Sequence, residues 1–81
     1  MDICKGSLVY SLAGRDKGKI FAVLAVEKDF VYLADGDSRR VEKPKKKKIK
    51  HINKINRVLE IDFDTISNSS LKKALSKYSS W

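Results

Sequence analysis

Cysteine, histidine and proline each occur only once among the 81 residues of the chain. The lone Cys4 cannot form an intramolecular disulfide, and a tetrahedral zinc site would need several more ligands than it supplies. No apolar run approaches the roughly 18–20 residues that span a bilayer, and the first residues lack the basic-then-apolar layout of a signal peptide. We therefore expect a protein of the cytoplasm, without a membrane segment, a metal site or a cofactor.

Groups that carry out catalysis are equally scarce. The chain has one histidine, one cysteine and no glycine-rich loop of the P-loop type. Asp62 and Asp64 would share one face of a strand, and paired carboxylates can be catalytic. A polar loop before a helix explains the two residues better. A chain of 81 residues forms one small domain with a thin core, which suits a compact barrel or sandwich better than a deep cleft. The sequence therefore predicts a protein that is not an enzyme.

Positive charge is abundant and concentrated in one part of the chain. The net charge is +8, and residues 39–57 carry ten lysines and arginines against Glu42 alone. Such a concentration repels itself unless an anionic partner is near, and nucleic acid is the commonest partner. Two alternatives are a solubilising basic loop and a basic helix on an anionic membrane, although the stretch lacks the Trp, Phe and Leu face of a membrane helix.

A basic turn at residues 14–19 separates two strand-like apolar runs, residues 8–13 and 20–26. Gly14 and Gly18 suit a tight, bulged connection, because glycine adopts positive φ without strain. The cations that project from this turn are Arg15, Lys17 and Lys19. A polyanion could bind these cations with little loss of conformational entropy. The simpler interpretation is a soluble hairpin turn with incidental charge.

Apolar periodicity predicts three strands in the first half of the chain. Residues 7–13 alternate between apolar and polar side chains, as a half-buried strand does. Residues 20–26 are apolar on both faces, which fits a central strand. Residues 30–34 are β-branched and aromatic, which favours a third strand.

The middle of the chain is less regular. A turn at residues 35–37 precedes a predicted short fourth strand at 39–42, which Pro44 ends because proline lacks a backbone donor. The cationic run that follows cannot itself lie in a core. Isoleucines recur at helical spacing through 49–61, yet we favour a short strand or turn at 49–52 that completes a barrel.

A helix is predicted at about residues 69–78, capped by Asn68 or Ser69. Its apolar face consists of Leu71, Ala74, Leu75 and Tyr78, and its basic face of Lys72, Lys73 and Lys77. The spacing of the apolar residues is that of an amphipathic helix, which either packs on the barrel or reaches a partner.

Residues 5–36, which read KGSLVYSLAGRDKGKIFAVLAVEKDFVYLADG, resemble the KOW motif of a strand, a glycine-containing turn, a Gly-Lys step and a second apolar strand. Gly18 matches the central glycine of the motif, and Lys17 and Lys19 match its flanking basic positions. The continuation over residues 35–52 is similar to KOW-type proteins related to archaeal and eukaryotic large-subunit ribosomal proteins. A small bacterial group of KOW domain RNA-binding proteins has a similar size and layout. Beyond Ile52 the chain departs from the ribosomal relatives.

The resemblance implies a mainly β fold, an SH3-like β-barrel of the KOW type, with RNA binding and no catalysis. We expect the barrel over residues 1–57, with the basic segment at 39–57, and a C-terminal extension with the helix over 58–81. The expected function is binding of ribosomal or structured RNA in association with the ribosome. Ribosomal proteins are further candidate partners, and the free protein is expected to be a monomer.

Most candidate RNA contacts are chosen for their charge, because lysine and arginine neutralise phosphates and arginine also pairs with them bidentately. Gly18 is added as the centre of the KOW resemblance, and His51 as a residue that could touch a phosphate or a base. They are Arg15, Lys17, Gly18, Lys19, Arg39, Arg40, Lys43, Lys45, Lys46, Lys47, Lys48, Lys50 and His51. The aromatic residues that could stack on bases are Tyr10, Phe21, Phe30 and Tyr32. A barrel this small needs aromatic residues in its core, so we expect these side chains there.

A rival interpretation is an SH3-like protein-interaction module of a transcription or translation complex. Fold alone does not assign function, and an acidic protein could use the same basic surface. DNA binding through phosphates is a third possibility, which charge does not separate from RNA binding because only contacts to the 2′-hydroxyl distinguish the two.

Overall fold

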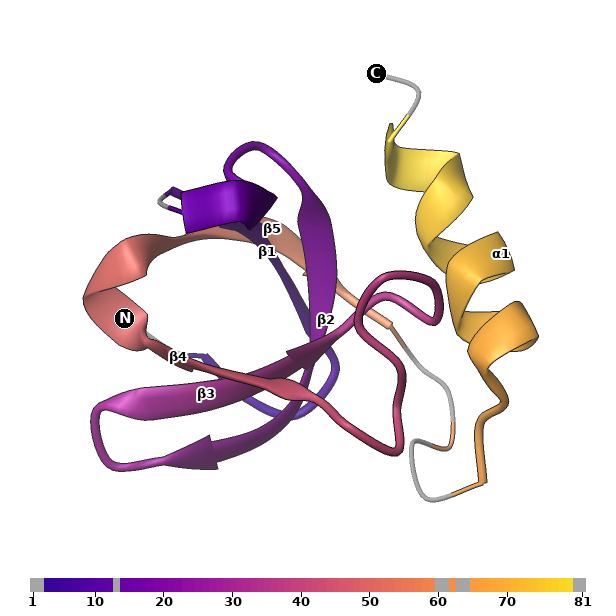
Figure 1. The fold of residues 1–81 in the computed structure, drawn as a ribbon, viewed down its shortest axis with the longest axis horizontal. Coiled ribbons are helices and arrows are strands. Elements are labelled where there is room, and N and C mark those ends of the chain that lie inside the picture. Colours follow the sequence, from indigo (N-terminus) through magenta and orange to yellow (C-terminus); the bar gives the residue numbers. More distant parts are fainter. Residues whose placement is uncertain (1–2, 13, 60–61, 63–64, 80–81) are drawn as a thin grey trace.

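The computed structural model describes residues 3–12, 14–59, 62 and 65–79, and this part of the chain forms five strands and one α-helix (Figure 1). The strands are β1 (Ser7–Ser11), β2 (Ile20–Glu27), β3 (Phe30–Ala34), β4 (Lys45–Lys48) and β5 (Ile52–Val58). Two short 3-10 helices, η1 (Gly14–Asp16) and η2 (Ile49–His51), precede β2 and β5, and the α-helix is α1 (Asn68–Ser79). Ala13, expected at the end of the first strand, lies outside the described residues.

The five strands form one antiparallel sheet in the order β4-β3-β2-β1-β5. The sheet curls, and η2 joins its two edge strands, β4 and β5, across the open side of the curl (Figure 1). Register shifts in β2 and at the start of β1 are the irregularities that let such a sheet bend. The fold is therefore mainly β, a small SH3-like barrel with a C-terminal helix, as the sequence predicts.

Both faces of the sheet are buried at its centre. The inner face holds one apolar cluster, Val9, Phe21, Val23, Val31, Leu33 and Ile52. On the outer face Leu8 and Ala22 pack with Leu71 and Leu75 of α1. This arrangement confirms the prediction of a central strand at 20–26. The prediction of a half-buried first strand is wrong, because Ser7, Val9 and Ser11, on the face opposite Leu8, are also buried.

The predicted apolar face of the helix is confirmed, with Leu71 and Leu75 buried. Burying a leucine side chain contributes about 1.5–3 kcal/mol. The predicted cap is wrong, because the Ser67 hydroxyl accepts the Ser70 N–H at 3.1 Å. Asn68 instead accepts the Val41 N–H at 2.8 Å and donates to Glu42, so its amide ties α1 to the loop before β4.

The predicted strand at 39–42 is also wrong, because the chain forms a closed loop there and pairs with β3 only from Lys45 onward. The Asp35 carboxylate accepts the N–H groups of Asp37 and Arg39 at 2.9 and 2.8 Å. The Arg39 carbonyl in turn accepts the Asp35 N–H at 2.8 Å. These bonds satisfy the backbone locally, so this segment does not need a neighbouring strand.

The isoleucine spacing through 49–61 does not produce an α-helix in the described residues. Ile49 and Ile52 pack against the inner cluster, whereas Ile55 and Leu59 pack against the outer one. The expected turn or strand that completes the barrel is present, as η2 followed by the start of β5.

Gly36 and Gly18 form a matched pair for testing how α1 docks. Both have positive φ, +78° and +85°, but a Cβ at Gly36 would lie 2.0 Å from the Asn68 carbonyl oxygen, and one at Gly18 would meet nothing within 4 Å. We expect Gly18→Ala to lower the free energy of unfolding by about 1–2 kcal/mol, the cost of a left-handed alanine. Gly36→Ala should lower it by about 3 kcal/mol or more, because the helix must also move. Urea unfolding of both variants measures the difference, and equal losses would contradict the close packing of α1 on this turn.

Candidate nucleic-acid interface

The turn between β1 and β2 is closed by backbone hydrogen bonds on both sides. The Ser11 N–H donates to the Lys19 carbonyl at 3.1 Å, and the Gly18 N–H donates to the Ser11 carbonyl at 2.8 Å. Gly14 and Gly18 have φ of +77° and +85°, which confirms that this connection uses glycine. The turn therefore presents the exposed Arg15 from a defined backbone.

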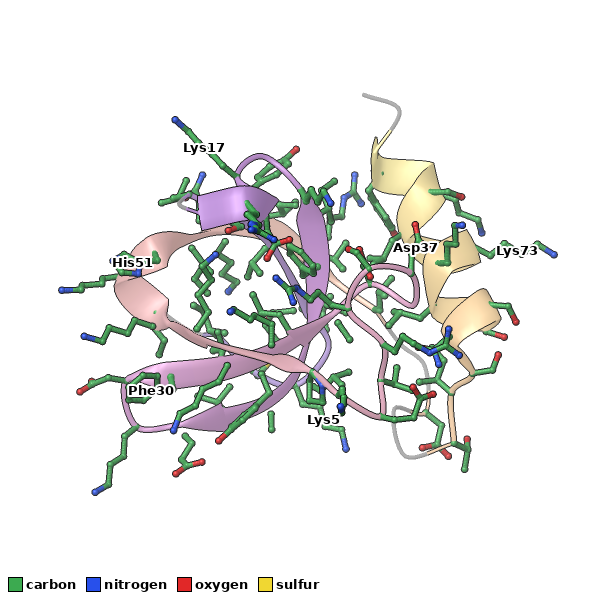
Figure 2. All side chains as sticks on the ribbon, in the orientation of Figure 1. Lys5, Lys17, Phe30, Asp37, His51 and Lys73 are labelled. Carbon is green, nitrogen blue, oxygen red and sulfur yellow. The ribbon has the colours of Figure 1, made fainter. Side chains whose placement is uncertain are left out.

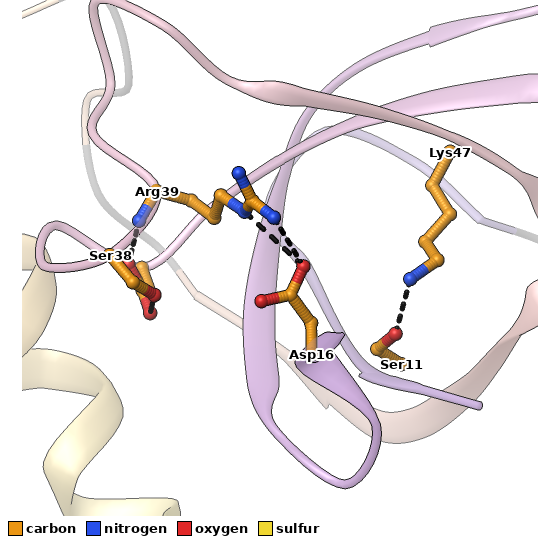
Figure 3. A network of polar contacts seen from close by, with 6 residues as sticks. Ser11, Asp16, Ser38, Arg39 and Lys47 are labelled. Carbon is orange, nitrogen blue, oxygen red and sulfur yellow. Dashed lines mark hydrogen bonds and ion pairs between the residues drawn. The ribbon is translucent and has the colours of Figure 1, made fainter. Parts of the chain in front are cut away.

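Asp16, which sequence reasoning did not single out, is the buried anchor of this turn. Its Oδ2 accepts hydrogen bonds from Arg39 Nη2 at 2.8 Å and Nε at 3.2 Å (Figure 3). Burial by itself raises the pKa of Asp16, but the hydrogen bond from Arg39 and the charges of Arg39, Lys47 and Lys19 hold it below its ordinary value overall. Arg39 is thus a structural partner of the turn as well as a candidate contact.

Lysines of β4 alternate between the two faces of the sheet. Lys47 is opposite Val31, a residue of the inner cluster, so it projects from the concave face. Its Nζ donates to the Ser11 hydroxyl at 2.5 Å across the barrel (Figure 3). Lys46 projects from the opposite face, and its Nζ lies 4.4 Å from the centroid of the Phe30 ring.

Basic side chains converge on one cavity of about 310 Å³ between η1, β4 and η2, which we call the cationic hollow. It is lined by Gly14, Arg15, Asp16, Arg39, Lys45, Lys47 and His51. Asp16 is the single acid of this lining, and Arg39 already engages it. Arg15, Lys45 and His51 are exposed around it, so the hollow presents a net positive surface.

Other predicted contacts lie away from the cationic hollow. Lys19 borders a cleft beside α1, and Arg40 forms an exposed ion pair with Glu42 at 3.2 Å. Lys48 and Lys50 lie beside Phe30 at a second cavity near the end of the barrel.

Two predicted contacts lie on the surface away from these cavities. Lys17 extends into solvent from the tip of the turn (Figure 2), and Lys43 is exposed in the loop before β4. Neither lines one of the cavities described above.

The aromatic residues of the barrel differ in how deeply they are buried. Phe21 is buried in the inner cluster, as expected. Tyr10, Phe30 and Tyr32 are half-buried, which corrects the expectation that they lie in the core. The Tyr32 hydroxyl donates to Glu27 at 3.0 Å.

No family model matches this chain, and a search of curated proteins finds no match. In the described residues, no helix is long and apolar enough to cross a membrane. The same part of the chain brings no three His, Cys, Asp or Glu side chains together for a metal ion. Asp64, which the sequence places near Asp62, lies outside the described residues.

Stability should depend on pH through Asp16. Because its pKa is lowered in the folded protein, the carboxylate stabilises the fold above its unfolded pKa of about 3.9. This contribution is lost as the pH falls below about 4, through the folded pKa. We expect Asp16→Asn to lower Tm at pH 7 and to flatten the fall in Tm between about pH 5 and pH 2. Thermal unfolding followed by circular dichroism measures both effects.

Asp37→Asn is the control for that experiment. It removes an exposed carboxylate whose Oδ2 lies 3.7 Å from Lys72 Nζ, and such pairs contribute little to stability. If Asp16→Asn and Asp37→Asn gave the same curve, the Asp16–Arg39 pair would not be the anchor of the turn.

Proposed function

We propose that this protein is a KOW-type RNA-binding protein that associates with the ribosome and binds ribosomal or structured RNA. The observation that carries the proposal is the cationic hollow, in which basic side chains from the 14–19 turn, β4 and η2 surround one cavity. The proposed role is binding and not catalysis.

Phosphate is the chemical group that the hollow suits best. Lysine and arginine gain affinity by releasing the counterions of the nucleic-acid backbone. Arg39 is held by Asp16 and Lys47 by Ser11, so these two cations need little further ordering when a ligand binds. Arg15 is exposed beside them, and its planar guanidinium can pair with a phosphate bidentately.

The resemblance of residues 5–52 to the KOW proteins of the large ribosomal subunit supports RNA as the source of the phosphate. In this proposal β1, the 14–19 turn and β2 are the strand, turn and strand of the motif, with Gly18 at its centre. RNA duplexes are recognised mostly by shape and backbone, which agrees with cations held in a defined arrangement.

An SH3-like protein-interaction module is the second candidate function. The cavity near the end of the barrel is lined by apolar side chains, by two lysines and by one acid: Phe30, Ile49, Ile52, Lys48, Lys50 and Asp29. The two lysines outnumber the acid, so the lining favours an acidic peptide with an apolar side chain. The material that copurifies distinguishes the two functions. Nucleic acid that high salt releases supports the first, and a stoichiometric protein partner supports the second.

Replacing Arg15 and Lys45 with glutamine should weaken RNA binding and reduce its salt dependence. Each phosphate contact contributes about 0.7–0.9 to the slope of log K against log salt, so the double variant should lose about 1.4–1.8 of the slope. Both side chains are exposed at the hollow, so the fold should persist. Fluorescence anisotropy with a labelled RNA duplex, repeated at several salt concentrations, measures the slope.

Lys73→Gln with Lys77→Gln is the matched control, because it removes the same charge from the exposed face of α1 (Figure 2). It should leave the slope close to that of the parent protein. Equal loss in the two double variants would mean that net charge, and not the hollow, determines binding.

Association with the ribosome is tested by crosslinking in cells followed by sequencing of the attached RNA. Reads concentrated in one region of large-subunit ribosomal RNA are expected. Reads scattered over all RNA would contradict a ribosomal site and would mean that the basic surface binds polyanions in general.

A further inference from the structure

The cleft beside α1 that Lys19 borders has a volume of about 510 Å³ and lies between α1, the sheet and the turn at 35–38. We call it the helix cleft. Tyr10 and Ile20 line it from the sheet, Asp37 from the turn, and Lys72 and Tyr78 from α1. Gly18 and Lys19 also line it, so the 14–19 turn borders both this cleft and the cationic hollow.

Charge in the helix cleft is balanced, unlike that of the hollow. Two carboxylates, Asp35 and Asp37, accompany the two lysines Lys19 and Lys72. A phosphate would be repelled by the acids as much as it is attracted by the lysines. The cleft therefore suits an uncharged group with hydrogen-bond donors better than it suits an anion.

The two carboxylates have different roles. Asp35 accepts hydrogen bonds from the Asp37 and Arg39 N–H groups and from the Ser38 hydroxyl, so it holds the turn in place. Asp37 lies 3.7 Å from Lys72 Nζ, and its side chain remains 65% exposed. Asp37 projects beside α1 (Figure 2) and can accept hydrogen bonds from a ligand in the cleft.

Aromatic surface in the cleft comes from Tyr10 of β1 and Tyr78 of α1, both half-buried. Leu75, which is buried in the outer cluster, adds apolar surface to the same cleft. Aromatic rings beside an exposed hydrogen-bond acceptor are the features with which proteins hold an unpaired nucleobase.

Guanine matches the Asp37 carboxylate better than the other bases do. Its Watson–Crick edge carries two adjacent donors, N1–H and the N2 amino group, and the two carboxylate oxygens can accept both. Adenine and cytosine place a ring-nitrogen acceptor beside their amino donor, and uracil flanks its N–H with two carbonyls. Each of these acceptors would face the carboxylate unfavourably.

We propose that the helix cleft receives a single unpaired guanine of an RNA whose backbone crosses the 14–19 turn into the cationic hollow. The inference rests on the proposed RNA-binding function and specifies the kind of RNA, a structured RNA with an extruded base. The turn joins the two cavities, so one strand can place a phosphate in the hollow and a base in the cleft.

The test compares three RNA duplexes of the same sequence, one fully paired, one with a bulged guanine and one with a bulged uracil. The parent protein should bind the guanine bulge about five- to 150-fold more tightly than the paired duplex, the range that one base–aromatic stack supplies. Tyr78→Leu should remove most of this preference but retain the affinity for the paired duplex. Asp37→Asn should remove the preference for guanine over uracil.

Tyr32→Leu is the matched control, since it removes a half-buried tyrosine from β3 that does not line the cleft. Tyr78 also packs against the outer cluster, so its replacement could disturb the fold. Tm is therefore measured for every variant to check that the fold is retained. Equal affinity for all three duplexes would overturn the inference while RNA binding stands, and equal affinity for the two bulges would overturn the choice of guanine. Binding to none of the duplexes would instead reject the proposed function itself.

Discussion

The ion pair between Asp16 and Arg39 holds together the parts of the molecule that form the proposed interface. Asp16 lies in the turn after β1, and Arg39 lies in the loop before β4, 23 residues further along the chain. Two N–H groups of the guanidinium contact one carboxylate oxygen, and the acid is almost fully buried. A buried carboxylate needs such a partner, because burial alone disfavours its charge. The positions of the turn and the loop are therefore coupled, and the hollow between them has a defined shape.

The loop at 35–44 connects this ion pair to the helix. Asp35 closes the loop on itself, Gly36 lies against the first turn of α1, and Val41 donates its N–H to Asn68. The same loop thus borders the cationic hollow on one side and the helix cleft on the other. When a ligand binds in one of these cavities, the other cavity is therefore already held in shape by these contacts.

The distribution of charge follows from the two-sided burial of the sheet. Its inner face is filled by apolar side chains, and α1 covers its outer face at β1 and β2, so the cations lie at edges, in turns and on the exposed side of the helix. Lys46 and Lys47 show how an edge strand of lysines is accommodated, because one lies over Phe30 and the other reaches Ser11. An edge strand with this much positive charge also discourages pairing with another copy of itself.

Local sequence was sufficient to predict the features that depend on neighbouring residues. The continuous apolar run located β2, the β-branched and aromatic residues located β3, and the two glycines located the turn at 14–19. The apolar spacing at Leu71 and Leu75 located the buried face of α1. Only the tertiary structure decided which cations meet, because the partners are distant in sequence: 23 residues separate Arg39 from Asp16, and 36 separate Lys47 from Ser11. The error at 39–42 has a local cause, because the Asp35 carboxylate accepts the N–H groups of Asp37 and Arg39 in its own loop. The tertiary structure decided the error at the helix cap, because Asn68 binds Val41 and Glu42, which lie 27 and 26 residues away in the sequence.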